Sequence, residues 1–400
     1  MKNVCLIGVS GYGHTHYNLL AAEQAAGKIA IVGVTIINPD DEKEKCAHLR
    51  GIGCRIFDDY TVMLKELSGV ADICFIPTGI PLHRPMTIAA LEAGMHVLVE
   101  KPAAGVIQDV RAMQEAAEKA NRRVAVGYQQ MYDPSTLEIK RAILEGRIGA
   151  VECMKCHAAW PRDSAYYNRN NWAGRLRSDD AWVLDSPANN AVAHDLMMML
   201  FLAGPRERTA AAPVSVTAEL YRANAIETAD TVCLRVRTDT GIPLLFYATH
   251  ACNRSINPEV HVRGTTGTVD LTREKATIET ATHGKQVINK LSSGPPLKRM
   301  IANVLDMVEG GTAFYCGLDV ASMQTIVVNA MHQACQIHTL AGERVALDNG
   351  AVRTIIPGIE EAIDMAFEKE RLFQEGGIPW ARPSGTLDCT GYREFKLTPC

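Results

Sequence analysis

The chain has 400 residues, of which 47% are hydrophobic, so it can bury a sizeable core and form about two or three domains of ordinary size. Its 41 lysine and arginine residues nearly balance its 45 aspartate and glutamate residues, for a formal net charge of −4. Neither sign of charge forms a long run, which argues against nucleic acid as the main partner. We therefore expect a compact globular protein.

The N-terminal segment has only a short apolar run, and no stretch reaches the roughly 18 consecutive apolar residues of a membrane span. The 12 cysteines are scattered, as expected for thiols that stay reduced. We predict a cytoplasmic protein with no membrane partner. Cys153 and Cys156 lie in an apparent strand, whose period of two places them on opposite faces, so we predict no metal site.

The chain begins with a short apolar strand, a glycine-rich turn and a helical segment. The glycines of the turn are Gly8, Gly11 and Gly13, and Ser10 stands where the second glycine of the G-x-G-x-x-G pattern is expected. In that pattern, glycine lets backbone amides approach a pyrophosphate at the N-terminus of the helix. The turn therefore predicts a dinucleotide site, although serine fits it less freely than glycine.

The second strand bears on the choice of cofactor. It ends near Asn38, where an aspartate or glutamate that binds ribose is usual, and an amide can also bond to ribose hydroxyls. Asp40 and Asp41 follow without a neighbouring arginine, so they would repel the 2′-phosphate of NADP unless Lys43 reaches it. We predict NAD as the cofactor, and the sequence leaves NADP open as the alternative.

Further strands alternate with helical segments up to about residue 127. One strand ends at Pro77-Thr78-Gly79, and two more lie in the segments 96–102 and 122–130. This alternation predicts a doubly wound, parallel α/β sheet over residues 1–127.

The strand at residues 97–99 is apolar on both faces, as in a parallel sheet covered on both sides, and it runs into Glu100-Lys101-Pro102. Ligands bind beyond the carboxyl ends of such strands. Pro102 fixes an extended or turn exit, with a cis bond as one option. Lys101 is thus either a lysine held at a ligand site or a surface lysine paired with Glu100.

From residue 128 onward the strands are longer and alternate in polarity, as in residues 231–251 with a turn at Thr240-Gly241. This pattern predicts an α+β domain over residues 128–400, with a large, open and mainly antiparallel sheet. Within it, Ser186-Pro187 resembles a helix start, and Gly204-Pro205 ends the same helix.

In that helix Asn190 and His194 would be four residues apart and share a face. A lone histidine in an apolar helix is more often a core residue than a catalytic one. The preceding segment, residues 158–182, is rich in tryptophan, tyrosine, arginine and asparagine. It predicts a carbohydrate or polyol site that includes Arg162, Asn171 and Trp172, and the alternative is an ordinary arm or subunit contact.

Five short motifs stand out along the chain: G-x-x-H from Gly13 to His16, TGIPLH at 78–83, ALEAGMHVLVEKP at 90–102, GYQQMYDP at 127–134 and ILEGRIGAVE at 143–152. Together they resemble the glucose-fructose oxidoreductase, inositol dehydrogenase and MocA family. One departure from the family pattern is Gly79, which stands where the family usually has proline in T-P-x-x-x-H.

The resemblance implies NAD(P)-dependent oxidation or reduction of a CH–OH group of a sugar, glycoside or polyol. It implies that Lys101 projects beside the nicotinamide and bonds the reacting hydroxyl, and that His194 acts as acid and base. Many members have Asp-x-x-x-His here, whereas this chain has Asn190, which orients a ring without adding charge. Asp195 lies about 100° away around the helix and is a poor substitute. Asp185 is a further candidate for compensation.

The resemblance also implies that one face of the second sheet covers the active site and the other pairs subunits, giving a homodimer or homotetramer. Two alternatives stay open: an NAD-dependent glycosidase that oxidises the sugar transiently, and a non-enzymatic dinucleotide-sensing regulator, against which Lys101 and His194 argue. The predicted catalytic residues are Lys101, His194 and Asn190; the predicted cofactor-binding residues are Gly8, Ser10, Gly11, Tyr12, Gly13, Asn38, Pro77, Thr78, Gly79, His83, Glu100, Lys101 and Gln129; and the predicted substrate-binding residues are Tyr128, Arg162, Asn171, Trp172, Asn190 and His194.

Overall fold

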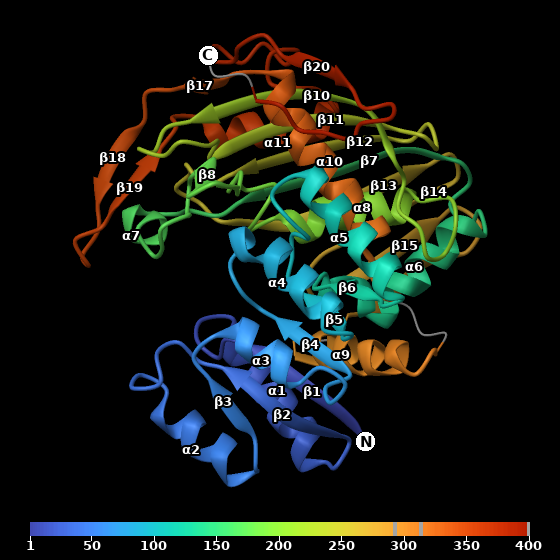
Figure 1. Cartoon of the computed structure of the whole chain (residues 1–400). Coiled ribbons are helices and arrows are strands. Elements are labelled where there is room, and N and C mark those ends of the chain that lie inside the picture. The colour runs from blue at the N-terminus through green and yellow to red at the C-terminus, as the bar shows by residue number, and fades with distance from the viewer. Residues whose placement is uncertain (291–293, 312–314, 398–400) are drawn as a thin grey trace. The chain divides into compact units, whose positions relative to one another are not determined.

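The computed structural model describes residues 1–290, 294–311 and 315–397, and the chain divides into two compact units (Figure 1). The first unit includes a segment near residue 300, which the sequence pattern predicts to belong to the second domain. The first unit consists of Met1–Ala104, Gln108–Gln129 and Leu297–Ala321, and the second of Gly105–Ile107, Gln130–Pro296 and Ser322–Cys400.

The first unit contains a six-stranded sheet in which every neighbouring pair is parallel, in the order β3-β2-β1-β4-β5-β6. This is the order of a dinucleotide-binding fold, and it confirms the doubly wound parallel sheet. Val97, Leu98 and Val99 are fully buried, as their apolar run predicts. The strands are β1 (Lys2–Ile7), β2 (Ile29–Thr35), β3 (Arg55–Phe57), β4 (Ile73–Ile76), β5 (His96–Val99) and β6 (Val124–Val126).

The strands of this sheet alternate with helices that start at recognisable signals. The Asp59 side chain accepts hydrogen bonds from the amides of Thr61 and Val62 at the start of α3, and α4 begins after Gly79 with a proline in its first turn. The helices between the strands are α1 (Gly13–Ala25), α2 (Lys43–Gly51), α3 (Tyr60–Glu66), α4 (Ile80–Glu92) and α5 (Ile107–Ala120). Most of α9 (Gly294–Val308) also belongs to this unit.

The outer edge of β6 is covered by a distant part of the chain. The Val126 amide donates to the carbonyl of Cys316 at 2.7 Å, and Ala125 forms an antiparallel bridge with Gly317. These bonds explain why residues near 316 belong to the first unit, because an uncovered edge would leave backbone groups unpaired.

The second unit contains a ten-stranded sheet in the order β16-β15-β14-β13-β7-β12-β11-β10-β17, and β20 also pairs with β10. All pairs are antiparallel except β7 with β12 and β10 with β17, which confirms the mainly antiparallel sheet. The strands are β7 (Val151–Ala159), β10 (Pro213–Arg222), β11 (Thr231–Thr238), β12 (Pro243–Thr249), β13 (Ile256–Gly264), β14 (Gly267–Leu271), β15 (Lys275–Thr280), β16 (Gly284–Asn289), β17 (Ile337–Thr339) and β20 (Gly385–Asp388).

Helices pack on both faces of this sheet. Helix α8 (Ala193–Ala203) contacts β7, β12 and β13, and α6 (Pro134–Leu144) contacts α8 and β15. Helix α11 (Ile359–Lys369) contacts β7 and β12, and its Ile363 and Ala366 share an apolar cluster with Cys153, Tyr247 and Phe373. Since strand side chains alternate, Cys156 lies on the face opposite Cys153, as expected. Helix α11 of the same chain thus covers part of one face of the sheet.

Helix α10 (Leu318–Ala334) holds two loops of the second unit with amide side chains. Asn329 donates to the carbonyl of Gly105 at 2.9 Å and accepts from the amide of Ile107 at 2.8 Å. Gln324 donates to the carbonyl of Ala188 at 2.9 Å. The remaining elements are η1 (Gln129–Tyr132), α7 (Ser164–Tyr167), β8 (Arg177–Ser178) paired with β9 (Ala181–Trp182), and a hairpin of β18 (Glu343–Ala346) and β19 (Val352–Ile355).

The expected start of the helix that carries His194 is wrong. Helix α8 begins at Ala193, and residues 187–192 form turns, so Asn190 precedes the helix and does not share a helical face with His194. Tertiary bonds override the local signal, because Gln324 binds the carbonyl of Ala188. The Ser186 hydroxyl finds no hydrogen-bond partner among the described residues and caps no helix. The end of the helix at Gly204 agrees with the prediction.

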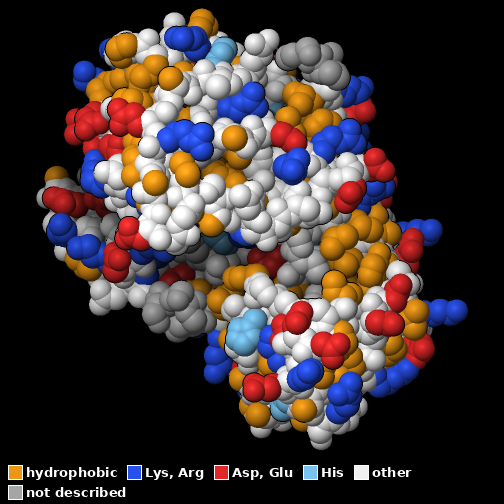
Figure 2. Space-filling model, turned by 90° about the vertical axis from the view of Figure 1, so that its left-hand side faces the viewer, with side chains coloured by type: hydrophobic (Ala, Val, Ile, Leu, Met, Phe, Trp, Pro, Cys, Tyr) orange, Lys and Arg blue, Asp and Glu red, His pale blue; other side chains and the backbone are white. Residues whose placement is uncertain are grey.

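Two surface properties bear on the expected partners. In the described part of the chain, no helix is long and apolar enough to cross a membrane. Acidic and basic side chains are interspersed on the face shown in Figure 2, as the near balance of charges leads one to expect.

Candidate functional site

The glycine turn lies between β1 and α1 and has the backbone that the motif requires. Gly8 and Gly11 have φ values of +90° and +55°, which L side chains rarely adopt, and a Cβ atom added at either would touch nothing within 4 Å. A Cβ at Gly13 would instead lie 2.7 Å from the carbonyl oxygen of Gly8. The turn is therefore open at Gly8 and Gly11, whereas Gly13 packs tightly against the backbone of Gly8.

This turn fits a pyrophosphate. Among the described residues, no backbone carbonyl accepts a hydrogen bond from the amides of Ser10, Gly11 and Tyr12, which precede the first turn of α1. Free amides at a helix N-terminus bind phosphate oxygens, and the helix dipole favours their charge. The side chain of Tyr12 is 44% exposed beside them. The residues present therefore match a dinucleotide in both shape and donor chemistry.

Ser10 is tied to the segment that follows β2. Its hydroxyl donates to Oε1 of Glu42 at 2.7 Å, and Nδ2 of Asn38 lies 3.3 Å from the same hydroxyl. Nζ of Lys45 binds Glu42 at 2.6 Å and the carbonyl of Val9 at 2.7 Å. The hydrogen bond from Lys45, followed by the one from Ser10, lowers the pKa of Glu42. The segment beside Asn38, the predicted ribose-binding residue, thus holds a charged carboxylate at Glu42.

Glu100 anchors the loop that carries Lys101. Its Oε1 lies 2.9 Å from Nε2 of the fully buried His16, and its Oε2 accepts from the amide of Lys101 at 3.1 Å. The carboxylate also packs against Gly127, where an added Cβ would approach to 2.5 Å. The Lys101–Pro102 bond is cis, which was one expected exit. Glu100 therefore fixes the backbone of Lys101 from inside the unit.

The loop after β4 is held by His83. Its Nδ1 lies 2.8 Å from the carbonyl of Pro102 and its Nε2 3.0 Å from the carbonyl of Thr78. Burial lowers the pKa of His83, and the two carbonyl groups oppose that shift. Pro77 lies beside the glycine turn, with its Cγ 3.6 Å from a Cβ built on Gly13. His83 thus joins the loops after β4 and β5, and direct cofactor contacts by Pro77, Thr78, Gly79 and His83 stay predictions.

Tyr128 and Gln129 follow β6. Tyr128 is only 1% exposed, and burial raises the pKa of its phenol; its predicted substrate contact stays a prediction. The Oε1 atom of Gln129 is buried and has no hydrogen-bond partner among the described residues. An unpaired buried amide oxygen is costly unless a ligand satisfies it, which suits the cofactor role predicted for Gln129.

In the first unit, the predicted cofactor residues therefore gather at one edge of the sheet. The glycine turn follows β1, Asn38 follows β2, Thr78 follows β4, Lys101 follows β5 and Gln129 follows β6. Ligands of open α/β sheets bind at this carboxyl edge, near the point where the strand order reverses between β1 and β4.

In the second unit, His194 and Asn190 lie at the start of α8. His194 is half-buried in the first turn of the helix, and Asn190 lies in the turn before it. Nδ2 of Asn190 donates to Oδ1 of Asp185 at 2.9 Å, and compensation by Asp185 for the missing aspartate stays a prediction. Burial raises the pKa of Asp195 to about 6, whereas Lys290 and Arg273 act to lower it. Asp195 thus interacts with those two cations.

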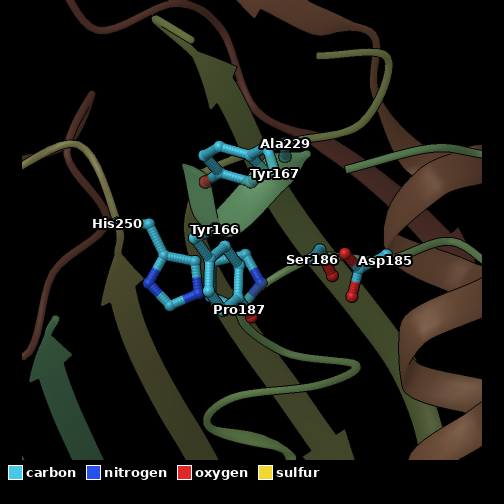
Figure 3. Close-up of a pocket in the computed structure, with 7 residues that line it drawn as sticks. All are labelled: Tyr166, Tyr167, Asp185, Ser186, Pro187, Ala229 and His250. Atoms are coloured by element: carbon cyan, nitrogen blue, oxygen red, sulfur yellow. The ribbon is translucent and has the colours of Figure 1, made fainter. Parts of the chain in front are cut away.

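A small pocket adjoins this turn. Figure 3 shows Asp185 and Ser186 on one side of it and the rings of Tyr166 and His250 on the other. Nδ1 of His250 lies 2.9 Å from the carbonyl of Trp160, and burial, reinforced by Arg162, lowers the pKa of His250 to about 3. The seven lining residues are Tyr166, Tyr167, Asp185, Ser186, Pro187, Ala229 and His250.

The aromatic and arginine residues of the segment 158–182 stack on one another. The guanidinium of Arg162 lies 4.5 Å from the centre of the Tyr166 ring. Arg169 lies 3.7 Å from the same ring and 5.2 Å from the ring of Trp172. Trp172 is half-buried and Asn171 is exposed. Substrate contacts by Arg162, Asn171 and Trp172 stay predictions.

Several residues that shape these sites could not be predicted from the sequence. Glu42 had no motif signal, because its partner Ser10 is 32 positions away. His16 carried a signal in the G-x-x-H spacing, although its bond to Glu100 was not foreseen. Tyr166, His250 and Gln324 could be found only from the folded chain.

Comparison with known families gives two matches that together cover more than half of the chain. Residues 2–128 match the family described as "Oxidoreductase family, NAD-binding Rossmann fold". Residues 136–270 match the "GFO/IDH/MocA C-terminal domain". The first unit is thus an NAD-binding Rossmann domain of this family.

Similar curated proteins carry related names. Inositol 2-dehydrogenase of Klebsiella pneumoniae subsp. pneumoniae is 27% identical over 198 residues, which are 49% of this chain and 53% of the relative. Inositol 2-dehydrogenase 4 of Saccharopolyspora erythraea is 30% identical over 154 residues, 38% of this chain and 44% of the relative. The chain thus spans about half the length of the curated relatives it matches.

Solved structures share the fold over a longer span. Levoglucosan dehydrogenase in complex with NADH and L-sorbose superposes with a TM-score of 0.70 at 18% identity, covering 83% of this chain and 96% of that one. The WlbA dehydrogenase of Bordetella pertussis, in complex with NADH and UDP-GlcNAcA, gives 0.67 at 22% identity, covering 83% and 96%. With both domain matches, the chain belongs to the glucose-fructose oxidoreductase, inositol dehydrogenase and MocA family of oxidoreductases.

Proposed function

We propose that the protein is an NAD-dependent oxidoreductase that acts on a CH–OH group of a sugar, glycoside or polyol. The observation that carries the proposal is the carboxyl edge of the first sheet, where an open glycine turn lies on the same edge as a lysine whose backbone is fixed by a buried glutamate. NAD, when bound, accepts the hydride. The chain's own residues must then place the substrate hydroxyl and handle its proton.

In this proposal the glycine turn binds the pyrophosphate through the amides of Ser10, Gly11 and Tyr12. The Gln129 amide, which has a buried unpaired oxygen, supplies a further polar contact. Lys101 bonds the reacting hydroxyl, and His194 takes or returns its proton. Because Asn190 is neutral, the pair would depend on Lys101 for positive charge at the substrate oxygen.

The segment 158–182 supports a carbohydrate or polyol substrate. Aromatic faces stack on the apolar side of sugar rings, and arginine and amide groups bond hydroxyls. The names of the relatives agree with this class, since they include inositol 2-dehydrogenase and the 1,5-anhydro-D-fructose reductase of Ensifer adhaerens, which is 38% identical over 88 residues, 22% of this chain and 26% of the relative.

A second pocket of about 250 Å³ borders Tyr167 and supports tests with substrates larger than one sugar ring. Arg344, Asn168 and Asn224 offer polar groups to a ligand there. An attached aglycone would also suit the NAD-dependent glycosidase, which uses transient oxidation and elimination. The dinucleotide-sensing regulator is the non-enzymatic alternative.

The proposal extends to assembly and location. A homodimer or homotetramer through the second sheet, in the cytoplasm, follows the family expectation. Since α11 of the same chain packs on β7 and β12, subunits would have to pair elsewhere on that face, for example over β13 and β14.

The test is a panel of inositols, monosaccharides, glycosides and disaccharides with NAD, followed by NADH absorbance and product analysis in the same samples. An oxidoreductase forms NADH and a keto product in equal amounts. A glycosidase releases an aglycone without net NADH. Binding of NAD with neither product across the panel would favour the regulator and contradict the proposal.

A further inference from the structure

Asp185 is a buried carboxylate whose two oxygens have different backbone and side-chain partners. The residue is 4% exposed. Oδ1 accepts from Nδ2 of Asn190 at 2.9 Å, and Oδ2 accepts from the amide of Gly174 at 2.6 Å. Because a buried carboxylate is costly without hydrogen bonds, both of these donors stabilise it.

The Gly174 donor is rigid. Gly174 has a φ of +69°, and a Cβ added there would lie 2.7 Å from Cγ2 of Ile226, so neither its conformation nor its contact suits another residue. The amides of Glu227 and Thr228 also donate to the carbonyl of Gly174, at 2.9 and 3.2 Å. Asp185 is therefore fixed to a backbone that cannot easily move.

The side-chain amide of Asn190 is a suitable hydrogen-bond donor for Asp185. An amide can donate to a carboxylate, whereas a carboxylate at position 190 would face Asp185 with like charge. The bond turns the nitrogen end of the Asn190 amide toward Asp185. Positions 185 and 190 are thus complementary, with one acceptor and one donor.

The same turn is held elsewhere by neutral bonds. Nδ2 of Asn189 donates to the carbonyl of Val183 at 2.8 Å, and Nε2 of Gln324 donates to the carbonyl of Ala188 at 2.9 Å. The backbone amide of Asn190 donates to the carbonyl of Ser186 at 3.0 Å. These three bonds should keep the turn folded if the Asp185–Asn190 bond is lost. We therefore expect the loss of that bond to shift the start of α8 without unfolding the turn.

We propose that Asp185 is a positioning residue, which acts through Asn190 to set the turn from which His194 enters α8. The inference rests on the proposed function, since it assigns Asp185 to the placement of the predicted acid/base. The carboxylate also borders the pocket of Figure 3, where Tyr166 has a pKa raised first by burial and then by Asp185. The charge of Asp185 therefore affects the ionisation of Tyr166 beside that pocket.

Reversing the pair provides the test, because the reversed pair can keep both hydrogen bonds. With Asp185→Asn and Asn190→Asp together, the amide oxygen at 185 can accept from Gly174 and its nitrogen can donate to the carboxylate at 190. Asp185→Asn alone can keep the bond only if the Asn190 amide turns its oxygen toward position 185, which reverses the polarity that Asn190 presents to the rest of the turn, and Asn190→Asp alone sets two carboxylates against each other. Each single variant should lower kcat about 10- to 100-fold with KM changed less, and the double variant should recover to within a few-fold.

Controls separate positioning from folding and from cofactor binding. Melting temperature and NADH affinity are measured for all variants. Asn349→Asp in the β18–β19 turn makes the same chemical change on the surface, where its side-chain oxygen still accepts from Ala351, and should leave kcat unchanged. Single variants that melt earlier but keep the wild-type kcat, or a reversed pair that stays as slow as the single variants, would overturn the proposal.

The two proposals can fail separately. If the wild type turns over no member of the panel, the proposed function fails, and the pair is then judged from the NMR ring signals of His194 in the protein without substrate. Displacement of these signals in both single variants and their return in the reversed pair would support the positioning role. Unmoved signals in the single variants would reject it.

Discussion

The hydroxyl of Ser10 donates a 2.7 Å hydrogen bond to Oε1 of Glu42, which joins the glycine turn to the segment after β2. The serine that departs from the glycine pattern therefore has a structural role. Lys45 binds the same carboxylate and the carbonyl of Val9, so its charge is already engaged. Glu42, Asp40 and Asp41 therefore give the segment after β2 a negative charge near Asn38.

We predict a preference for NAD over NADP, because a 2′-phosphate near Asn38 would face these carboxylates. Glu42→Gln should narrow the ratio of kcat/KM for the two cofactors by about tenfold, in the range of a single close charge interaction. Glu44→Gln, one position beyond Lys43 on the exposed side of α2, is the matched control. A wild type that prefers NADP would show that Lys43 or another residue reads the phosphate.

Lys101→Ala should abolish nearly all turnover and leave NADH affinity within a few-fold. The lysine is proposed to serve the hydroxyl, and a group of this kind contributes about 10²–10⁴-fold to the rate. Steady-state kinetics and fluorescence titration with NADH measure the two effects. Lys119→Ala, at an exposed position near the end of α5, controls for the loss of a lysine charge. An unchanged kcat in Lys101→Ala would remove the lysine from the mechanism.

His250 should make the protein sensitive to acid. Its pKa is lowered to about 3 by burial, whereas the unfolded value is about 6.5. Between these values the unfolded chain binds a proton that the folded chain does not, so stability falls as the pH drops below about 6.5.

His250→Asn keeps a donor for the Trp160 carbonyl and removes this titration. Between pH 7 and pH 5 it should lose less free energy of unfolding than the wild type, by roughly 2 kcal/mol at most. Urea unfolding at both pH values measures the difference. His283→Asn, at an exposed position, is the control. Equal losses in His250→Asn and the wild type would mean that His250 is charged in the folded protein.

Asn329→Ala should destabilise the fold. The substitution leaves the carbonyl of Gly105 and the amide of Ile107 without their buried partner, which costs about 2–4 kcal/mol for the two bonds. Asn303→Ala, which removes one bond to the Arg299 carbonyl near the surface, should cost less than about 1 kcal/mol. Urea unfolding compares the two variants, and equal midpoints would contradict the role assigned to Asn329.

The parts of the fold that could be predicted are those with a local signal. Val97–Val99 is apolar on both faces because neighbouring strands and helices cover it, and the turn at Thr240-Gly241 requires the positive φ that Gly241 adopts. The start of α8 differs from the prediction, which followed the local helix-start signal of Ser186-Pro187. This signal is overridden by Gln324, which binds the carbonyl of Ala188 from 136 positions away.

The site follows the same division. The residues at the carboxyl edge of the first sheet could be named from their places after strands. The bonds that orient them, such as Glu42 with Ser10 and Asp185 with Asn190, depend on which polar groups meet after folding. The sequence contains several residues that could bond to Ser10 or to Asn190. The sequence pattern alone therefore does not determine which of them forms the bond.

The bond between Val126 and Cys316 has a consequence for the order of events on the ribosome. The Rossmann sheet has all six strands once residue 126 has emerged, but the edge of β6 must wait for residues near 316. At about 5–20 residues per second, that wait lasts roughly 10–40 s. During this time an unpaired strand edge is available to other chains, so nascent-chain chaperones should matter more for this protein than for one whose nucleotide domain is contiguous.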